Sequence, residues 1–151
     1  MKIMITGHRP PRLKGQEQKV KEWVAAVVAE LAKKEKIEAA YCGMAQGADQ
    51  IFFRVVAALF IPIYCCYPWK KKDMDFIEEA CLAGLDGNPP YTRVWLYDKY
   101  PGKYGYIERD RYMVDNSDVV LAVWDGVEQG GTWDTIEYAK SKGKQIIYLE
   151  V

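Results

Sequence analysis

The sequence lacks an excess of charge of either sign. Lys and Arg together number 21, as do Asp and Glu, so the formal net charge at pH 7 is +0. Without a global field, the chain cannot gather nucleic acid or an anionic membrane surface non-specifically. The only basic run, Lys70 to Lys72, is short. Nucleic acid is therefore not an expected partner.

A hydrophobic run long enough for a membrane span is also missing. The longest apolar stretch, from Val55 to Trp69, is interrupted by Pro62 and is shorter than the roughly 20 residues that a span needs. Met1 and Lys2 lead directly into a short apolar segment, with no signal peptide. These absences predict a cytoplasmic protein without a membrane partner.

Cysteine and histidine are scarce. Cys65 and Cys66 are adjacent, so in a strand they would face opposite sides of the sheet and suit neither a mutual disulfide nor one shared metal. Of the four cysteines, three fall in or beside apolar segments, which favours buried thiols in a reducing compartment. No metal site and no cofactor are predicted. His8 is the only histidine.

Apolar runs alternate with amphipathic segments along the whole chain, half of which is hydrophobic. The expected strands are 2–6, 37–42, 61–67, 92–97, 118–124 and 145–149, and the expected helices are 16–34, 50–60, 73–85, 106–116 and 132–142. The prolines after His8 predict a loop there. We predict an α/β fold: one doubly wound Rossmann-like domain over residues 1–151, with a mostly parallel six-stranded sheet and helices on both faces.

Three glycine turns follow predicted strand ends, at Gly7, at Gly43 to Gly47 and at Gly126 to Gly131. Ligands of open α/β sheets lie beyond the carboxyl ends of the strands, where the winding direction reverses. The turns should therefore meet in one crevice if the first and fifth strands are neighbours. Tight turns also favour glycine without any ligand, which is the structural alternative.

The sequence contains neither the dinucleotide motif GxGxxG nor the Walker motif GxxxxGK[ST], so common NAD(P) and P-loop functions lose their main support. Instead, Gly130-Gly131-Thr132 precedes a predicted helix. The first N–H groups of a helix have no intrahelical acceptor and carry the positive end of its dipole. This turn predicts a site for a phosphate-bearing small molecule.

Several polar side chains are expected near the turns. Arg109 is a candidate for gripping a phosphate or carboxylate. His8 could contact a phosphate, act as an acid or base, or be structural. Three acids are expected at the crevice: Asp49, Asp125 and Asp134. Of these, Asp49 and Asp134 could equally serve the first turns of helices. Aromatic rings near strand ends could stack a base or simply pack: Tyr67, Trp69, Trp124 and Trp133.

Motifs along nearly the whole chain carry a family resemblance. They are Ile5 to Pro10, Gly43 to Asp49, Arg109 with Met113 to Asp115 and Ser117-Asp118, Trp124 to Gly126, and Gly130 to Thr132. In these motifs the chain resembles the YpsA-like branch of the SLOG superfamily, which groups the Rossmann-like folds of DprA and of the Lonely Guy enzymes. The resemblance implies binding of a nucleotide or nucleotide-derived ligand. The implied contacts are Thr6, Gly7, His8, Arg9, Gly43, Met44, Gly47, Asp49, Arg109, Asp125, Gly126, Gly130, Gly131 and Thr132.

The same resemblance offers an enzymatic alternative. Lonely Guy enzymes are phosphoribohydrolases that cleave the N-glycosidic bond of a nucleoside monophosphate. Arg109 and Asp134 match an arginine and the first acid of that family, but Thr135 stands where a catalytic glutamate is expected, and Glu137 could replace it. Three hypotheses follow: a nucleotide-binding module, an N-glycosidase using Arg109, Asp134 and Glu137, and, less favoured, a single-stranded DNA binder. The aromatic loop from Tyr97 to Tyr106 could form a homo-oligomer interface.

Overall fold

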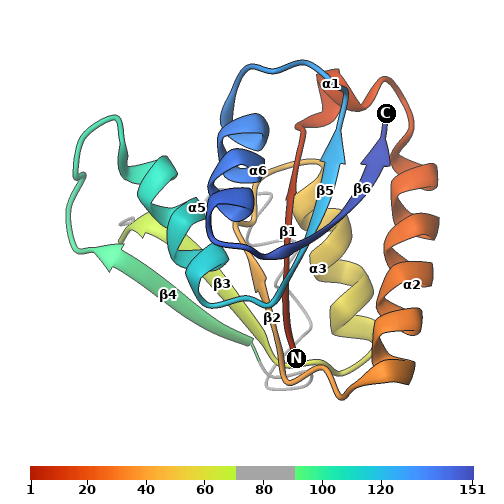
Figure 1. The fold of residues 1–151 in the computed structure, drawn as a ribbon. Helices are drawn as coiled ribbons and strands as arrows, with labels where there is room; N and C mark the ends of the chain where they lie inside the picture. Colours follow the sequence, from red (N-terminus) through yellow and green to blue (C-terminus); the bar gives the residue numbers. More distant parts are fainter. Residues whose placement is uncertain (71–90) are drawn as a thin grey trace.

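Six parallel strands form one sheet at the centre of the molecule (Figure 1). The computed structural model describes residues 1–70 and 91–151. The strands are β1 (Lys2–Gly7), β2 (Ala39–Cys42), β3 (Ile63–Trp69), β4 (Tyr91–Tyr97), β5 (Val119–Trp124) and β6 (Gln145–Glu150). Their order is β4-β3-β2-β1-β5-β6, and every neighbouring pair is parallel. The predicted Rossmann-like fold is confirmed, with a sheet that is parallel throughout the described residues rather than mostly so.

Two helical layers cover the sheet. The helices α2 (Glu17–Lys34) and α3 (Ala48–Ala58) pack on one face, and α5 (Gly105–Asp115) and α6 (Gly131–Ser141) pack on the other (Figure 1). Side chains on α2 are buried at the spacing of a helical face: Val20, Val24, Val28 and Leu31. Among the described residues, no helix combines the length and the apolar composition needed to cross a membrane.

Alternation along each strand divides the core in two. Ile3 and Ile5 join the α2–α3 side, whereas Met4 between them joins the α5–α6 side. Cys65 and Cys66 divide in the same way, and both are fully buried. The expectation that this pair faces opposite sides of the sheet as buried thiols is confirmed.

The winding direction reverses between β1 and β5. From β1 the chain builds outward through β2 and β3 to β4, and it then returns to place β5 on the other side of β1. These two strands pair from Ile3 opposite Val119 to Gly7 opposite Val123, so their carboxyl ends lie together. Right-handed crossovers on either side of the reversal put the helices on opposite faces.

The main departure from the predicted elements lies directly after β1. A short helix, α1 (Pro10–Leu13), occupies the segment where the sequence predicts a loop. Proline is tolerated there because the first helical positions need no intrahelical N–H donor, and its φ already suits a helix. The other described elements agree with the predicted ranges to within about two residues, the uncertainty common to helix ends. The helix predicted over 73–85 and the break at 86–90 lie outside the described residues.

Gly7 allows β1 and α3 to approach closely. A Cβ atom at this position would lie 2.5 Å from the Cβ of Ala48 and 3.0 Å from that of Val123. Both distances are shorter than ordinary contacts between carbon atoms. The glycine therefore keeps the start of α3 against the end of β1.

Candidate functional site

A cavity of about 330 Å³ opens beyond the carboxyl ends of β1 and β5. The turn after β1, the turn before α3, helix α5 and the first turn of α6 all contribute to its wall. The lining residues are Ile5, Thr6, Gly7, His8, Arg9, Arg12, Ala45, Asp49, Tyr106, Arg109, Asp110, Met113, Gly131 and Thr132. Residues from all three glycine turns, or the helices that they begin, thus border one cavity.

The first turn of α6 presents unused hydrogen-bond donors to this cavity. Gly130, at φ 94°, is the N-cap, and no side chain caps the helix. The first helical bond runs from the N–H of Asp134 to the carbonyl of Gly130 at 3.0 Å, so the preceding N–H groups have no intrahelical acceptor. A Cβ atom on Gly131 would meet no atom within 4 Å. The geometry suits an anion.

Asp125 is engaged by the protein itself. Nε and Nη2 of Arg12 donate to its two carboxylate oxygens, each at 2.8 Å. This two-point hydrogen bond holds the pKa of Asp125 well below its usual range. The pair joins α1 to the end of β5, and it leaves the Nη1 atom of Arg12 beside Gly130.

His8 links the end of β1 to the same turn. Its Nε2 lies 3.1 Å from both the backbone nitrogen and Oδ1 of Asp125, and its Nδ1 lies 3.3 Å from the hydroxyl oxygen of Thr132. The ring is only 4% exposed, and burial, together with the nearby Arg12, lowers its pKa. With both ring nitrogens engaged by protein atoms, His8 positions Thr132 and the β5–α6 turn.

Arg109 is buried at the centre of the site. Its Nη1 donates to the carbonyl oxygens of Gly43, at 2.8 Å, and Cys66, at 3.2 Å, while Nε donates to Oδ1 of Asp110 at 2.7 Å. No hydrogen bond within the described part of the chain involves Nη2. The guanidinium group therefore ties α5 to the ends of β2 and β3, and its Nη2 has no hydrogen bond to a described residue.

Asp49 lies beside this arginine and is 8% exposed. A Cβ atom on Gly43 would lie 2.8 Å from Nη1 of Arg109 and 2.9 Å from Oδ2 of Asp49, so only glycine leaves room for both groups. Burial raises the pKa of Asp49 to about 7; Asp110 adds to the rise and Arg109 opposes it. Burial also raises the pKa of Asp110.

Other predicted contacts lie away from the cavity. Met44 is fully buried in the core at φ 60°, and its carbonyl accepts a hydrogen bond from Gln50 at 3.2 Å. Gly47, at φ 93°, packs against His8, where a Cβ atom would lie 2.5 Å from the carbonyl oxygen. Gly126 lines a separate hollow beside β6. Gly43 lines a smaller recess of about 50 Å³ next to the main cavity.

The two acids expected to be catalytic are both exposed. Asp134 lines a recess of about 20 Å³ that it shares with Asp110 and Thr135. Glu137 forms an ion pair with Lys140 at 3.4 Å and does not line the main cavity. Of the predicted catalytic residues, only Arg109 borders that cavity.

Arg12, Asp110 and Tyr106 are site residues that the sequence prediction missed. Asp110 follows Arg109 directly and could have been found from that adjacency. Tyr106 is 41% exposed, and its ring centre lies 5.5 Å from the guanidinium carbon of Arg109. By contrast, Trp124 and Trp133 stack on each other, with ring centres 5.1 Å apart, which explains their positions by packing.

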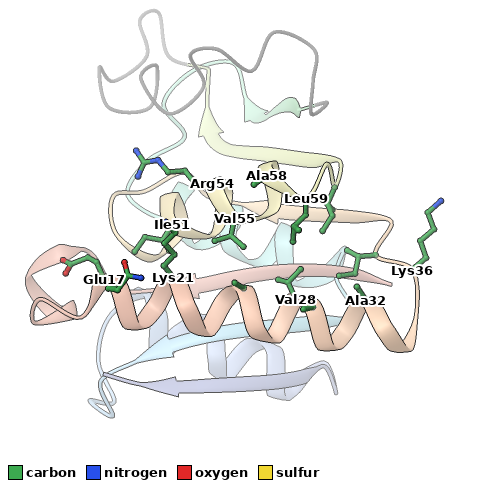
Figure 2. A pocket seen from close by; sticks show the side chains of 15 residues that line it. Glu17, Lys21, Val28, Ala32, Lys36, Ile51, Arg54, Val55, Ala58 and Leu59 are labelled. Atoms are coloured by element: carbon green, nitrogen blue, oxygen red, sulfur yellow. The ribbon is translucent and has the colours of Figure 1, made fainter.

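A larger hollow lies between α2 and α3, far from this chemistry. It measures about 990 Å³, and Figure 2 shows its lining side chains. The floor is apolar, with Val28, Ile51 and Val55, and charged side chains such as Lys36 lie at the rim. The polar residues among those that line it are all exposed: Glu17, Gln18, Lys21, Lys36 and Arg54. In residues 1–70 and 91–151, no group of three or more His, Cys, Asp or Glu side chains could hold a metal ion.

Neither a protein-family model nor a curated protein matches the chain. Solved structures match it in fold. DNA processing protein A (DprA) from Helicobacter pylori has a TM-score of 0.74 and 21% identity, over 100% of this chain and 66% of that chain. The chain shares the DprA fold. DprA from Streptococcus pneumoniae has a TM-score of 0.68 and 16% identity, over 97% of this chain and 49% of its own.

A structural genomics target, TM1055, has a TM-score of 0.59 and 19% identity, over 96% of this chain and 71% of its own. By contrast, this chain spans less than two thirds of the length of each of the two DprA chains. At these identities, the likeness to the DprA structures shows a shared Rossmann-like fold.

We expect Asp49→Asn to stabilise the protein increasingly as pH rises. An aspartate in an unfolded chain titrates near about 3.9, whereas Asp49 titrates at about 7 in the folded protein. Between these pH values, the folded state holds a proton that the unfolded state has lost. The free energy of unfolding of the wild type therefore falls as the pH rises from about 4 to about 7, and it changes little above pH 7. The variant escapes this loss, which is on the order of a few kcal/mol.

Thermal unfolding followed by circular dichroism between pH 4 and pH 8 measures this difference. Asp98→Asn, at an exposed aspartate outside the cavity, is the matched control and should give a difference that does not change with pH. A stability gain for Asp49→Asn that is the same at every pH would contradict the prediction.

Proposed function

We propose that the protein binds a phosphorylated nucleoside, or a small molecule derived from one, in the cavity beside β1 and β5. One observation carries the proposal: Gly131 and Thr132, at the uncapped start of α6, border the same cavity as Arg109. Its volume of about 330 Å³ is at the small end of the roughly 300 to 1,000 Å³ typical of ligand sites. That size suits one nucleotide.

The phosphate is assigned to the α6 end of the cavity. Backbone N–H groups and the helix dipole favour an anion there. Arg9 is exposed on the cavity wall, and Nη1 of Arg12 would lie 3.2 Å from a Cβ atom on Gly130. These cations supply the charge that a dianion requires. Arg12 is held in place by Asp125, so little reorganisation is needed on binding.

The base is assigned to Tyr106. Its half-exposed ring lines the cavity, and Arg109 lies against the ring at 5.5 Å. Any nucleobase can stack on an aromatic ring, because stacking does not depend on the hydrogen-bonding groups of the base. The ring therefore supports binding of a nucleoside rather than of phosphate alone.

Gly131→Val should abolish binding of adenosine 5′-monophosphate and leave the fold intact. The position is helical and its Cβ direction is open, so valine fits without strain but fills the phosphate end. Isothermal titration calorimetry measures the affinity, and circular dichroism checks the fold. Ser141→Val, exposed near the other end of the same helix, is the control and should bind normally. Unchanged affinity in Gly131→Val would refute the placement of the phosphate.

Tyr106→Ala should weaken binding of adenosine 5′-monophosphate but not of inorganic phosphate. Stacking of one base on an aromatic ring contributes about 1 to 3 kcal/mol, which corresponds to a loss of affinity of about fivefold or more. Titration of each variant with both ligands makes the comparison. Tyr104→Ala is the control, because Tyr104 is an exposed tyrosine at the N-cap of α5 that does not line the cavity. An equal loss for both ligands would exclude stacking as the cause.

Hydrolysis of the N-glycosidic bond is a second candidate, favoured by Asp110. The hydroxyl of Thr135, the residue at the position of the missing glutamate, lies 3.3 Å from Oδ2 of Asp110. Asp110 also lines the main cavity. Its carboxylate could therefore stabilise an oxocarbenium-like transition state in place of Asp134 or Glu137.

If this candidate is correct, the wild type releases adenine from adenosine 5′-monophosphate, and Asp110→Asn binds the nucleotide without releasing adenine. Chromatography of the reaction mixture measures the free base. Absence of release from a wild-type protein saturated with nucleotide would leave binding as the function.

Single-stranded DNA is a further candidate, because the Helicobacter protein of the same fold is described by its single-stranded DNA binding mode. The cavity fits one nucleotide, and the chain carries no net charge, so a mononucleotide is favoured. Titration with a thymidine oligonucleotide alongside the mononucleotide distinguishes the two ligands.

Membership of the YpsA-like branch, a cytoplasmic location and a homo-oligomer stay predictions. Tyr100 and Tyr104 are 63% and 60% exposed on the aromatic loop, which supports that loop as the oligomer interface. Sedimentation of the wild type and of a variant with both tyrosines changed to serine tests the interface.

A further inference from the structure

Asp49 differs from the other acids around the cavity in having no cation bound to it. Arg109 forms its ion pair with Asp110 at 2.7 Å, and Arg12 forms its ion pair with Asp125 at 2.8 Å. Within the described residues, no Lys, Arg or His nitrogen lies within 4.0 Å of the Asp49 carboxyl. The carboxyl is nevertheless buried, at 8% exposure.

The two oxygens of the Asp49 carboxyl differ in their hydrogen bonds. Oδ2 accepts a hydrogen bond from the N–H of Ala45 at 3.2 Å, whereas no hydrogen bond in residues 1–70 and 91–151 involves Oδ1. Asp49 lines the same cavity as Thr132 and Arg109. Oδ1 is accessible to solvent rather than sealed in the interior. An accessible carboxyl oxygen without a protein partner, on a residue that lines a cavity, is a group that a ligand can satisfy.

Each element around Asp49 contributes a titratable or charged group. Helix α5 contributes Arg109 and Asp110, the loop after β1 contributes Arg9, and β2 contributes the buried thiol of Cys42. Burial and Asp110 favour the neutral carboxyl, while the arginines favour the ionised one. An anion bound in the cavity would add a second negative charge, which favours the neutral form further.

We propose that the site takes a dianionic oxyanion together with one proton, and that the proton resides on the ligand-facing carboxyl of Asp49. The neutral carboxyl of Asp49 donates one hydrogen bond through Oδ1 to the ligand. An ionised carboxylate would instead repel the anionic ligand. Asp49 is thus a specificity-determining residue that favours anions with unprotonated oxygens. The inference rests on the proposed function, because it concerns the same cavity.

Inorganic sulfate is the probe, since it stays a dianion throughout the range studied and any proton taken up must come to the protein. Calorimetric titration at pH 6, 7 and 8, in two buffers with different ionisation enthalpies, gives both the affinity and the number of protons. With Asp49 titrating at about 7, the affinity should fall about tenfold from pH 6 to pH 8, with uptake of about half a proton at pH 7.

Two substitutions separate the proton from the hydrogen bond. Asp49→Asn, whose amide can donate as the neutral acid does, should bind sulfate at pH 8 about as tightly as the wild type does at pH 6, with no proton uptake. Asp49→Ala should also lose the uptake, but it should bind several-fold more weakly than the asparagine variant. Asp98→Asn should keep the wild-type pH dependence.

Proton uptake that persists in Asp49→Asn would overturn the inference, as would a wild-type affinity that does not vary with pH. Equal binding by the alanine and asparagine variants would show that Asp49 donates no hydrogen bond to the ligand. That result would also overturn the inference. If the wild type binds neither sulfate nor adenosine 5′-monophosphate at any of these pH values, the proposed function itself is wrong. The two failures are therefore distinguishable.

Discussion

The parallel pairing of β1 with β5 is the constraint on which the rest of the site depends. It brings the carboxyl ends of two strands, distant in the sequence, to one edge of the sheet. Because the winding reverses there, α3 and α6 begin on opposite faces of the sheet, and the space between their first turns is not filled by a crossover. Gly7 strengthens the arrangement by allowing α3 to approach β1. The cavity is a consequence of topology first and of side chains second.

Charge pairing then determines which charged groups around the cavity are already engaged by the protein. Burying an ion is costly unless a partner and hydrogen bonds compensate it. Arg109 meets Asp110 and two carbonyl groups, and Arg12 meets Asp125, so both arginines are fixed before any ligand arrives. Donors that are already oriented bind an anion without the reorganisation that flexible side chains require. Among the described residues, Asp49 forms no ion pair within 4.0 Å, and burial raises its pKa to about 7.

The elements of the fold followed from local patterns. Apolar runs marked the strands, the spacing of Val20, Val24 and Val28 marked α2, and glycines marked the turns. The exception, α1, is local as well: consecutive prolines oppose a helix interior but suit its first turn, so the same residues support a loop or a helix start. Glycines carried less information about function than their number implied. Gly7 and Gly47 are required by packing against Ala48 and His8, whereas Gly131 faces open space.

The sequence by itself determined the fold class, the glycine turns and the place of Arg109 on the helix before the fifth strand, because hydrophobic periodicity and turn chemistry depend on residues close together in the chain. Only the tertiary structure decided which polar side chains stay available. Arg12 and Asp125 are 113 positions apart, and His8 and Thr132 are 124 apart, so no local pattern could indicate that each pair is in contact. These contacts follow from strand order, which removed Asp125 and both nitrogens of His8 from the cavity and left Asp49, Asp110 and Tyr106 on its wall.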